Sequence, residues 1–534
     1  MRQTLVVAFL FVILAPLALA QPPATASLFK VRDFGAAADG AAKDTAAIQS
    51  AIDACAAAGG GTVYFAPGTY LCGSVQLKTG VFLYLDASAT IKASPDNGDF
   101  NPYEKLGFKN DADVETSFFH RSLIWAEDAE RIGIVGPGTV DGNRNRRVGP
   151  KPTAFKRCRY LDVKGISIIN APNYCISMLG CDYVNIDGVT ILNAYCDGID
   201  PDSCHNVRIS NCHIESMDDA IVPKTSFSLG ERRSCENITV TNCYLATSAN
   251  CFKLGTESGG DFKYIAVSNC VMTGFDAMSP ATSGISLESV DGANIDGVVI
   301  SNITMHDVRA PIFVRLGARL RDDAPAPGSL RNVIISDVVA VNALAPSSIT
   351  GIPGSYPEGI SLSNIRLTYT GGGPAPTDPN APVPELEKEY PDADMFETLP
   401  AYGLYCRHVK DLTLSNVHLL YADNFQRRPP EGQPKPSTPG NPGAALVADD
   451  VAGLDIDALH ARAGDSFPVL RFINVRDASV RNCRAPENTG VYLHVSGKNS
   501  ARIDFTNNAM LNAATCVATA AELLPEIVHR VPGN

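Results

Sequence analysis

From residue 161 onward, one pattern of apolar and polar positions recurs along the chain. Apolar residues alternate with polar ones, a turn-prone residue interrupts the alternation, and the alternation then resumes. The copies read LDVKGISI (161–168), VNIDGVTI (184–191), VRISNCHI (207–214), ITVTNCYL (238–245), IAVSNCVM (265–272), VVISNITM (298–305), VIISDVVA (333–340), ISLSNIRL (360–367), LTLSNVHL (412–419) and, more weakly, ASVRNCRA (478–485). Alternation with a period of two predicts two short strands in each copy, with a tight bend between them.

The spacing of the bends predicts how these strands assemble. Successive bends from Gly165 to Asn364 are 23 to 35 residues apart. Strand repeats of this length without helices between them are typical of a parallel solenoid, in which each turn of chain stacks on the one before. Asn at the bend tolerates a left-handed backbone and can form a ladder with the next turn. We therefore predict an all-β fold, a single-stranded parallel β-helix, forming one domain over residues 21–534.

The regions outside the repeats fit this fold. Residues 29–70 predict a strand, a short amphipathic helix at about 44–58, a glycine turn and another strand. Such a helix would cap the open end of the solenoid, where strand edges are otherwise unpaired. Residues 371–400 and 424–443 are rich in proline and polar residues, and we predict loop insertions that shape a groove or cover an end.

The N-terminus predicts the compartment. Arg2 precedes an apolar run that ends in Ala18-Leu19-Ala20, which is the pattern of a secretory signal peptide over residues 1–20. We expect a secreted or periplasmic protein that has no membrane contact after cleavage. The net charge of −13 argues against nucleic acid or an anionic membrane as a partner.

Cysteines are numerous for an exported chain. There are fifteen, and the odd number leaves at least one unpaired unless a bridge joins two molecules. Cys212, Cys243 and Cys270 occupy the same inward position in successive repeats, so we interpret them as small apolar core residues rather than redox groups. The spacing predicts no disulfide connectivity. No Cys or His cluster has the spacing of a metal site, so we expect neither a structural metal nor a cofactor.

The repeat predicts where the stretch SMDDAIVPKT (216–225) lies in the solenoid. Asp218 and Asp219 lie seven and eight residues after the bend at Asn211, and Asp197 lies nine residues after the bend at Gly188. Because stacked turns are about 4.8 Å apart, Asp197 should face the Asp218/Asp219 pair. Neighbouring residues of a regular strand point to opposite faces, so a turn or bulge near 217–220 is also required.

Three close carboxyl groups favour acid–base chemistry. They cannot all ionise cheaply, so at least one pKa should be raised, leaving an acid beside a base. Glycoside hydrolysis needs this pairing. One turn later the same side carries Asn250, Lys253 and Glu257. From spacing alone, turn-capping or calcium-binding aspartates remain an equal alternative.

The chain from about 29 to 420 resembles the polygalacturonase family, glycoside hydrolase family 28. FKVRDFGAAADG, GGGTVYFAPGTY and GPGTVDGN (136–143) are similar to its N-terminal region. Tyr195-Cys196-Asp197-Gly198 resembles the family's Asn-Thr-Asp-Gly motif, and Met217-Asp218-Asp219 resembles its Gly-Asp-Asp motif. The resemblance implies a right-handed β-helix and an inverting hydrolase. It also implies that Asp218 is the general acid, while Asp197 and Asp219 hold and deprotonate the attacking water.

Two motifs of the family are altered here. Asn250-Cys251 stands where the family has His-Gly, and Ser286-Leu287-Glu288 stands where it has Arg-Ile-Lys. Both cations that would hold a galacturonate carboxylate are therefore missing. Relatives that cleave rhamnogalacturonan, or that release neutral sugars such as rhamnose, would fit an acidic subsite better.

Other residues are candidates to contact substrate from neighbouring turns. Lys224, Lys253 and Arg315 could contact an anionic sugar. Glu257 and Glu288 are further candidates, for which hydrogen bonding to a neighbouring turn is an equal alternative. In the aromatic segment 389–409, Tyr402, Tyr405 or Phe396 could stack on sugar rings, although core packing accounts for them equally well.

We therefore predict an exported, monomeric glycoside hydrolase whose partner is a pectin-type polysaccharide or oligosaccharide. The loop at 371–400 hints at attack on chain ends, and substrates of the rhamnogalacturonan or galacturonan type are favoured. Two alternatives remain. A β-helix polysaccharide lyase would use Lys224 or Lys253 as its base, often with calcium. A non-catalytic carbohydrate-binding solenoid would retain the groove without turnover.

Overall fold

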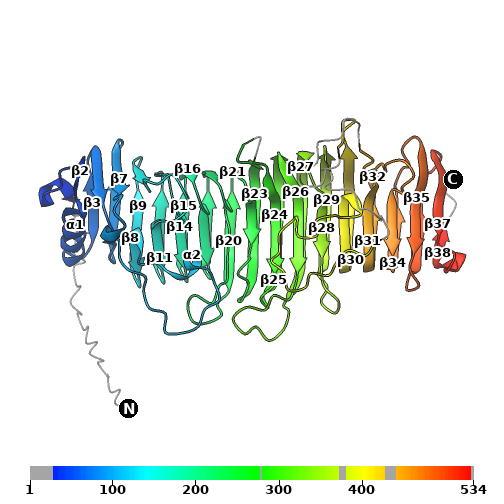
Figure 1. Ribbon diagram of the computed structural model, residues 1–534, viewed down its shortest axis with the longest axis horizontal. Coiled ribbons are helices and arrows are strands. Elements are labelled where there is room, and N and C mark those ends of the chain that lie inside the picture. Colours follow the sequence, from blue (N-terminus) through cyan, green and yellow to red (C-terminus); the bar gives the residue numbers. More distant parts are fainter. Residues whose placement is uncertain (1–27, 277–278, 372–380, 427–439, 531–534) are drawn as a thin grey trace, which may run out of the picture.

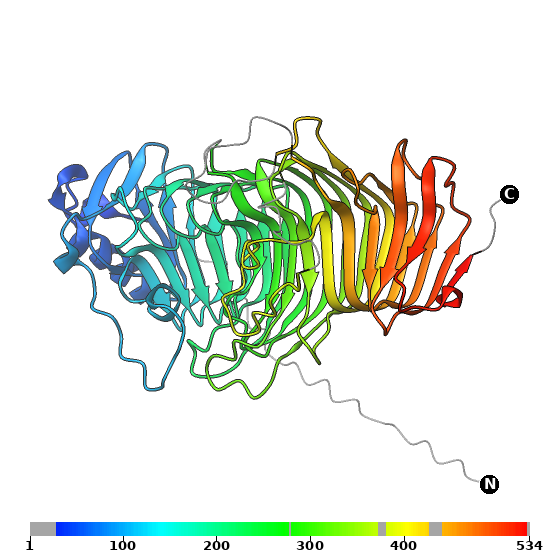
Figure 2. The same ribbon diagram turned by 45° about the vertical axis from the view of Figure 1, so that its right-hand side comes forward.

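The computed structural model describes residues 28–276, 279–371, 381–426 and 440–530. Parallel strands stack along one long axis, with the N-terminal turns at one end and the C-terminal turns at the other (Figure 1). The second view shows the same stack with loops extending from its sides (Figure 2). The predicted signal peptide at 1–20 and parts of both predicted insertions, 372–380 and 427–439, lie outside the described residues. The parallel β-helix is confirmed.

Each turn of the helix contributes strands to three faces. The site face contains β5 (Val75–Gln76), β8 (Ser122–Glu127), β11 (Lys151–Lys156), β14 (Ile176–Leu179), β17 (Ile199–Asp202), β22 (Asn250–Leu254), β24 (Ala281–Ser289), β26 (Val308–Leu316), β28 (Ser347–Thr350), β33 (Leu470–Ile473), β35 (Thr489–Ser496) and β37 (Ala513–Thr519). The second face contains β1 (Leu28–Lys30), β3 (Gly61–Phe65), β6 (Val81–Leu85), β9 (Glu130–Val135), β12 (Arg159–Lys164), β15 (Asp182–Asp187), β18 (His205–Ser210), β20 (Cys235–Thr241), β34 (Arg476–Arg481), β36 (Ala501–Thr506) and β38 (Val528–Arg530).

The third face follows the second after a bend. It contains β2 (Asp39–Lys43), β4 (Gly68–Cys72), β7 (Ala89–Ala93), β10 (Thr139–Asp141), β13 (Ser167–Ile169), β16 (Thr190–Ala194), β19 (His213–Ser216), β21 (Tyr244–Thr247) and β32 (His460–Ala461). Four longer strands run through that bend and serve both faces, namely β23 (Phe262–Gly274), β25 (Asn294–His306), β27 (Ser329–Ala343) and β29 (Glu358–Tyr369). Two more begin on the site face: β31 (Ala444–Asp457) continues to the second face, and β30 (Ala401–Tyr421) continues through the second face to the third.

The predicted bends have the expected backbone. Asn211, Asn242, Asn269 and Asn302 have φ values of 57°, 56°, 57° and 55°. Asn tolerates this left-handed region better than most residues. Their side chains also form the predicted ladder, with Asn242 Nδ2 donating to Asn211 Oδ1 at 3.4 Å and Asn302 Nδ2 to Asn269 Oδ1 at 3.2 Å.

The core is the inside of the coil. Apolar residues at matching positions of successive turns fill it, such as Val207, Ile238 and Ile265 on the second face. Cysteines extend the same packing, and Cys212 and Cys243 are only 2% and 3% exposed. All fifteen cysteines are free thiols. The predicted role of Cys212, Cys243 and Cys270 as core residues is confirmed.

A helix covers the N-terminal end. α1 (Thr45–Ala57) begins one residue after and ends one residue before the predicted limits. It lies at the end of the stack (Figure 1) and places Ile48, Ala51, Ile52 and Cys55 against the first turns. The other helical segments are short: η1 (Val31–Phe34), η2 (Asn97–Asp99), α2 (Val114–Ser117) and η3 (Pro525–Ile527). Among the described helices, none is long and apolar enough to cross a membrane.

Candidate active site

The helical register brings the predicted aspartates together on the site face. The backbone N–H of Gly198 donates to the carbonyl of Asp219 at 2.9 Å, and that of Ala220 donates to the carbonyl of Asn250 at 2.9 Å. Asp197, Asp219 and Asn250 therefore occupy the same position in three successive turns. The side-by-side arrangement inferred from the spacing is thus present in the structure.

Asp218 reaches the same place through a break in the strand. β19 ends at Ser216, and residues 217, 218 and 220 lie in bends, as the adjacent aspartates require. Hydroxyl groups of Ser216 and Thr247 donate to the Asp218 carbonyl at 2.6 Å each and fix this bend. The Asp218 side chain is 29% exposed and that of Asp219 is 7% exposed. Carboxylate oxygens of Asp197 and Asp218 and the Cys196 Sγ lie within 4.8 Å of one another.

Asp197 belongs to a buried charge cluster. Lys224 Nζ lies 2.8 Å from Asp197 Oδ2 and 2.9 Å from Asp200 Oδ1, and it donates to the Tyr174 hydroxyl at 2.8 Å. Burial raises the pKa of the Asp197 carboxyl well above its usual range, although the Lys224 ammonium opposes the shift. Burial also raises the pKa of Asp200. Two carboxyl groups share one ammonium here, an arrangement that favours one bound proton between them.

Asp219 is held from the following turn. Asn250 donates to Asp219 Oδ1 through its side chain at 2.7 Å and its backbone at 3.0 Å. Lys253 Nζ lies 3.3 Å from Asp219 Oδ2. Ser283 donates to Asn250 Oδ1 at 2.6 Å, which orients the amide. The asparagine at the family's histidine position therefore holds the Asp219 carboxylate in place.

Glu288 also faces this cluster and is paired within the protein. Its carboxylate lies 3.7 Å from Lys253 Nζ, accepts from Ser286 at 2.6 Å and lies 3.1 Å from Thr256 Oγ1. Burial raises the pKa of Glu288 to about 7, and the Lys253 ammonium opposes that shift. The position expected to hold a cation thus carries a buried carboxyl group.

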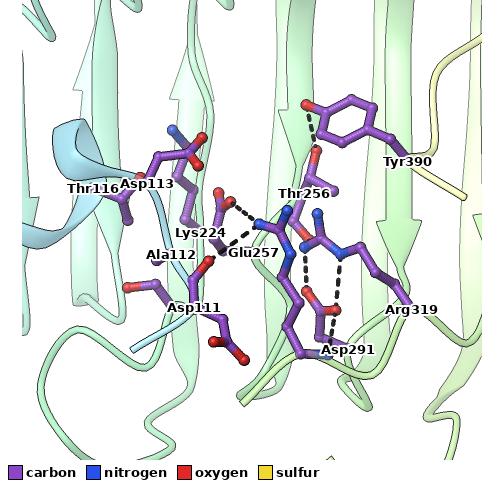
Figure 3. Close-up of polar contacts among 12 residues, drawn as sticks. Asp111, Ala112, Asp113, Thr116, Lys224, Thr256, Glu257, Asp291, Arg319 and Tyr390 are labelled. Carbon is purple, nitrogen blue, oxygen red and sulfur yellow. Dashed lines mark hydrogen bonds and ion pairs between the residues drawn. The ribbon is translucent and has the colours of Figure 1, made fainter. Parts of the chain in front are cut away.

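The segment at 381–400 contributes an aromatic ring to the site. Tyr390 is 54% exposed, while its hydroxyl lies 2.9 Å from Thr256 Oγ1 (Figure 3). The same hydroxyl lies 3.4 Å from Lys253 Nζ. On the same segment, burial raises the pKa of Asp392 to about 6. Tyr390 lies within the aromatic segment noted in the sequence, but the sequence did not distinguish it from its neighbours.

Glu257 lies away from the Asp218 and Asp219 carboxylates. It is beside Lys224 (Figure 3), and its Oε1 is 3.9 Å from Arg321 Nη1. Close by, Arg319 Nε donates to Asp291 Oδ1 at 2.9 Å. The role of Glu257 in substrate binding stays a prediction.

Arg315 and the predicted aromatic residues lie deeper than expected. Arg315 is 1% exposed and donates to the carbonyls of Gly351, Glu385 and Leu386. Burial lowers its pKa to about 10. In this structure the Arg315 guanidinium holds the 381–400 segment through these hydrogen bonds and is buried away from solvent.

The expectation that Tyr402 stacks on a sugar is wrong. Tyr402 is fully buried in the main core, and its hydroxyl donates to the carbonyls of Leu419 and Arg462. It is the second residue of β30, so it belongs to a strand and not to a loop. Tyr405 and Phe396, 1% and 5% exposed, pack together in a smaller apolar cluster. Core packing accounts for all three.

Sequence reasoning missed Arg147 and Asp200. Arg147 lies between β10 and β11, and its Nη1 is 2.5 Å from Asp218 Oδ2. The sequence repeat does not include that loop, so the position of Arg147 relative to the aspartates could not be predicted. Asp200 was readable as an outward residue, because it follows the core residue Ile199 in the strand, but alternation alone does not bring it to Asp197; both aspartates meet at Lys224.

The comparisons agree with this architecture. A family model described as "Glycosyl hydrolases family 28" matches residues 106–380, and one described as "Rhamnogalacturonase A/epimerase, pectate lyase-like" matches residues 28–122. A probable polygalacturonase of Vitis vinifera is 24% identical over 368 residues, which cover 63% of this chain and 73% of the relative. An endo-polygalacturonase of Pectobacterium carotovorum subsp. carotovorum is 24% identical over 356 residues, which cover 61% and 84%.

Solved structures support the fold. The hyperthermoactive exopolygalacturonase from Thermotoga maritima superposes with a TM-score of 0.59 at 20% identity, covering 74% of this chain and 91% of that one. This likeness confirms the right-handed parallel β-helix. Because the family model covers more than half of the sequence, the chain belongs to glycosyl hydrolase family 28 and is a glycoside hydrolase.

Proposed function

We propose that this protein is an exported hydrolase that cleaves glycosidic bonds of pectin-type polysaccharides or oligosaccharides. The observation that carries the proposal is the convergence of Asp197, Asp218 and Asp219 from two turns of the helix, each with different partners. Asp218 is the most exposed of the three and sits on a bend after β19. Asp197 and Asp219 are buried and held by cations and amides.

The differences in exposure and partners assign a different step of hydrolysis to each aspartate. Asp218 gives its proton to the oxygen that leaves the anomeric carbon. Asp197 and Asp219 hold a water molecule and take its proton as the water oxygen bonds to that carbon. One carbon–oxygen bond breaks, one forms, and the proton lost by water replaces the one lost by the acid over a full cycle.

We propose inversion of configuration, because Asp197 and Asp219 are both tied to neighbouring groups and suit water binding better than nucleophilic attack. The separation of Asp197 and Asp218, with oxygens within 4.8 Å, argues the other way, because it is nearer to the roughly 5–5.5 Å of retaining enzymes than to the roughly 6.5–9.5 Å of inverting ones. Proton NMR of the first-formed product decides the point. An anomer opposite to that of the substrate supports inversion, and the same anomer refutes it.

The two lysines favour hydrolysis over elimination. A lyase needs an unprotonated base, whereas Lys224 and Lys253 each lie against two carboxylates. Those carboxylates raise the pKa of both ammonium groups well above the usual value, although burial opposes them. A charged ammonium cannot abstract the proton beside a uronate. Calcium-independent formation of saturated products would support the hydrolase, and products absorbing in the ultraviolet would support the lyase.

A binding solenoid without turnover is tested in the same assays. The native protein and Asp218→Asn should bind a pectin oligosaccharide similarly, while only the native protein releases reducing sugar. Equal binding with no release by either would refute the hydrolase. Attack at chain ends is tested with a long polygalacturonate, since an exo-acting enzyme releases reducing ends with little fall in viscosity.

A further inference from the structure

The segment 381–400, which brings Tyr390 into the site, is attached to the β-helix just before that tyrosine. Arg315 donates to the carbonyls of Glu385 and Leu386 at 2.7 Å and 3.0 Å. The segment then runs on to Tyr390, whose ring is exposed on one side. The position of this ring therefore depends on how firmly the chain is held at Glu385.

The side chain of Glu385 is held by two neighbours on β30, Arg407 and His408. Arg407 Nη2 forms an ion pair with the Glu385 carboxylate. His408 is buried, and its Nε2 lies 3.2 Å from both carboxylate oxygens of Glu385. Its Nδ1 lies 2.7 Å from Asp450 Oδ2 on β31. Each nitrogen of the His408 ring thus faces a carboxylate.

This arrangement suits a protonated ring. A neutral imidazole has one N–H and one lone pair, whereas both nitrogens donate when the ring carries a second proton. A neutral His408 would keep its N–H for the shorter contact, with Asp450, whose Oδ2 also accepts from the Tyr356 hydroxyl at 2.7 Å. The Nε2 lone pair would then face Glu385, and Arg407 alone would hold that side chain.

The groups around His408 are charged or titratable and come from several elements. They are Glu385, Tyr356, Arg407, Asp449, Asp450 and Arg476. Between about pH 6 and pH 8, arginine stays charged, tyrosine ordinarily stays neutral and carboxyl groups are ordinarily ionised. Burial raises the pKa of Asp449, but this group lies against Arg407 Nε, at 3.7 Å. Because histidine ordinarily changes charge in this range, a rise in pH acts on the cluster chiefly through the ring.

We propose that His408 is a positioning residue of the site. While it is protonated, it binds Glu385 and Asp450 together and holds the 381–400 segment, with Tyr390, beside Lys253. Loss of the proton as pH rises loosens the segment and weakens substrate binding. The effect on substrate rests on the proposed hydrolase function, whereas the contact between His408 and the segment does not. The protein thus has a basic limit to substrate affinity that is separate from the ionisation of the aspartates.

The test is hydrogen exchange of the backbone amides in 381–400, measured by mass spectrometry and corrected for the intrinsic effect of pH. In the native protein, exchange should be roughly three- to tenfold faster at about pH 8 than at about pH 6. His408→Gln should exchange fast at both values, and Glu385→Gln, which removes the carboxylate, should lose the pH response. His418→Gln, on β30 but stacked on His460 of the third face, is the matched control and should behave as the native protein. Circular dichroism and Tm confirm folding of each variant.

An equal response of exchange to pH in the native protein, His408→Gln and Glu385→Gln would overturn the inference. Steady-state kinetics on an oligogalacturonide gives the second readout. KM of the native protein should rise with pH, and KM of His408→Gln should be high at both values, with the same pH dependence of kcat in both proteins. A native KM in His408→Gln would refute the positioning of Tyr390. If exchange responds as expected but no protein forms product, the role of His408 is supported and the hydrolase function fails.

Discussion

Lys224 forms a buried ion pair with Asp197, with 2.8 Å between Nζ and Oδ2 and side-chain exposures of 5% and 4%. Asp200 Oδ1 lies 2.9 Å from the same ammonium and competes for it. Burial favours the neutral form of Asp197, Asp200 adds a repulsive charge, and Lys224 opposes both effects. The ionisation of the proposed base is therefore set by two neighbours of opposite charge.

Removing Asp200 and removing Lys224 should shift the acidic limb of the pH profile of kcat/KM in opposite directions. Asp197 must be ionised to accept a proton from water, so kcat/KM falls as pH drops through its pKa. Asp200→Asn removes a charge that raises that pKa, so the acidic limb should shift to lower pH. Lys224→Gln removes a charge that lowers it, so the limb should shift to higher pH. A shift of both variants in the same direction, in proteins with native circular dichroism, would contradict this account.

The pKa of Glu288 predicts a pH-dependent stability. Its pKa is about 7 in the folded protein and 4.5 as its ordinary value. The folded state thus holds this proton more tightly, and the resulting stability is complete below pH 4.5 and is lost as pH rises through about 7. The loss amounts to at most about 3 kcal/mol. Glu288→Gln should flatten the pH dependence of the unfolding free energy measured in urea. The exposed Glu358→Gln should leave it unchanged, and an equal slope in all three proteins would refute the assignment.

Much of the fold was readable because it depends on periodicity. Alternating residues defined the strands, asparagines marked bends that need positive φ, and the 23-residue spacing between Gly188 and Asn211 indicated that Asp197 lies beside Asp219. The rest of the site depends on loops that do not follow the repeat of the β-helix. Arg147 and Tyr390 reach the site from such loops, so nothing in their local sequence predicts their position.

The misplacement of Tyr402 has a related cause. The aromatic density of 389–409 suggested one loop, but the segment divides at Ala401, where β30 begins. The residues before that point form the loop, and those after it alternate into the core. Aromatic content alone cannot locate such a boundary, because exposed stacking rings and core rings are the same residue types.

Tyr390 should act as a platform for a sugar ring. Its ring is half exposed while its hydroxyl is anchored at Thr256, so the side chain is held rigid beside Asp219. Tyr390→Ala should weaken binding of an oligosaccharide about tenfold, because aromatic contacts contribute about 0.5–1.5 kcal/mol. Tyr390→Phe should retain most of the affinity. Calorimetry with Tyr183→Ala, an equally exposed tyrosine on the second face, gives the control. Equal affinity of Tyr390→Ala and native protein would exclude the platform.

The bends predict the effect of changing an asparagine in the ladder. Asn242 has a φ of 56° and donates to Asn211. Asn242→Ala should lower the unfolding free energy by about 1–2 kcal/mol, because alanine disfavours a left-handed backbone. Asn242→Gly should cost less, since glycine adopts this conformation readily. Chemical denaturation of both variants checks the order, and a larger loss in the glycine variant would refute the conformational explanation.

The most direct test of the account is mass spectrometry of products from polygalacturonate, rhamnogalacturonan and rhamnose-capped oligosaccharides, with the native protein beside Asp218→Asn. We predict saturated sugars, each carrying the mass of an added water, from at least one of these substrates with the native protein. Asp218→Asn, folded as judged by Tm, should yield none. Unsaturated products, or identical product yields from the two proteins, would contradict hydrolysis by the aspartates of this groove.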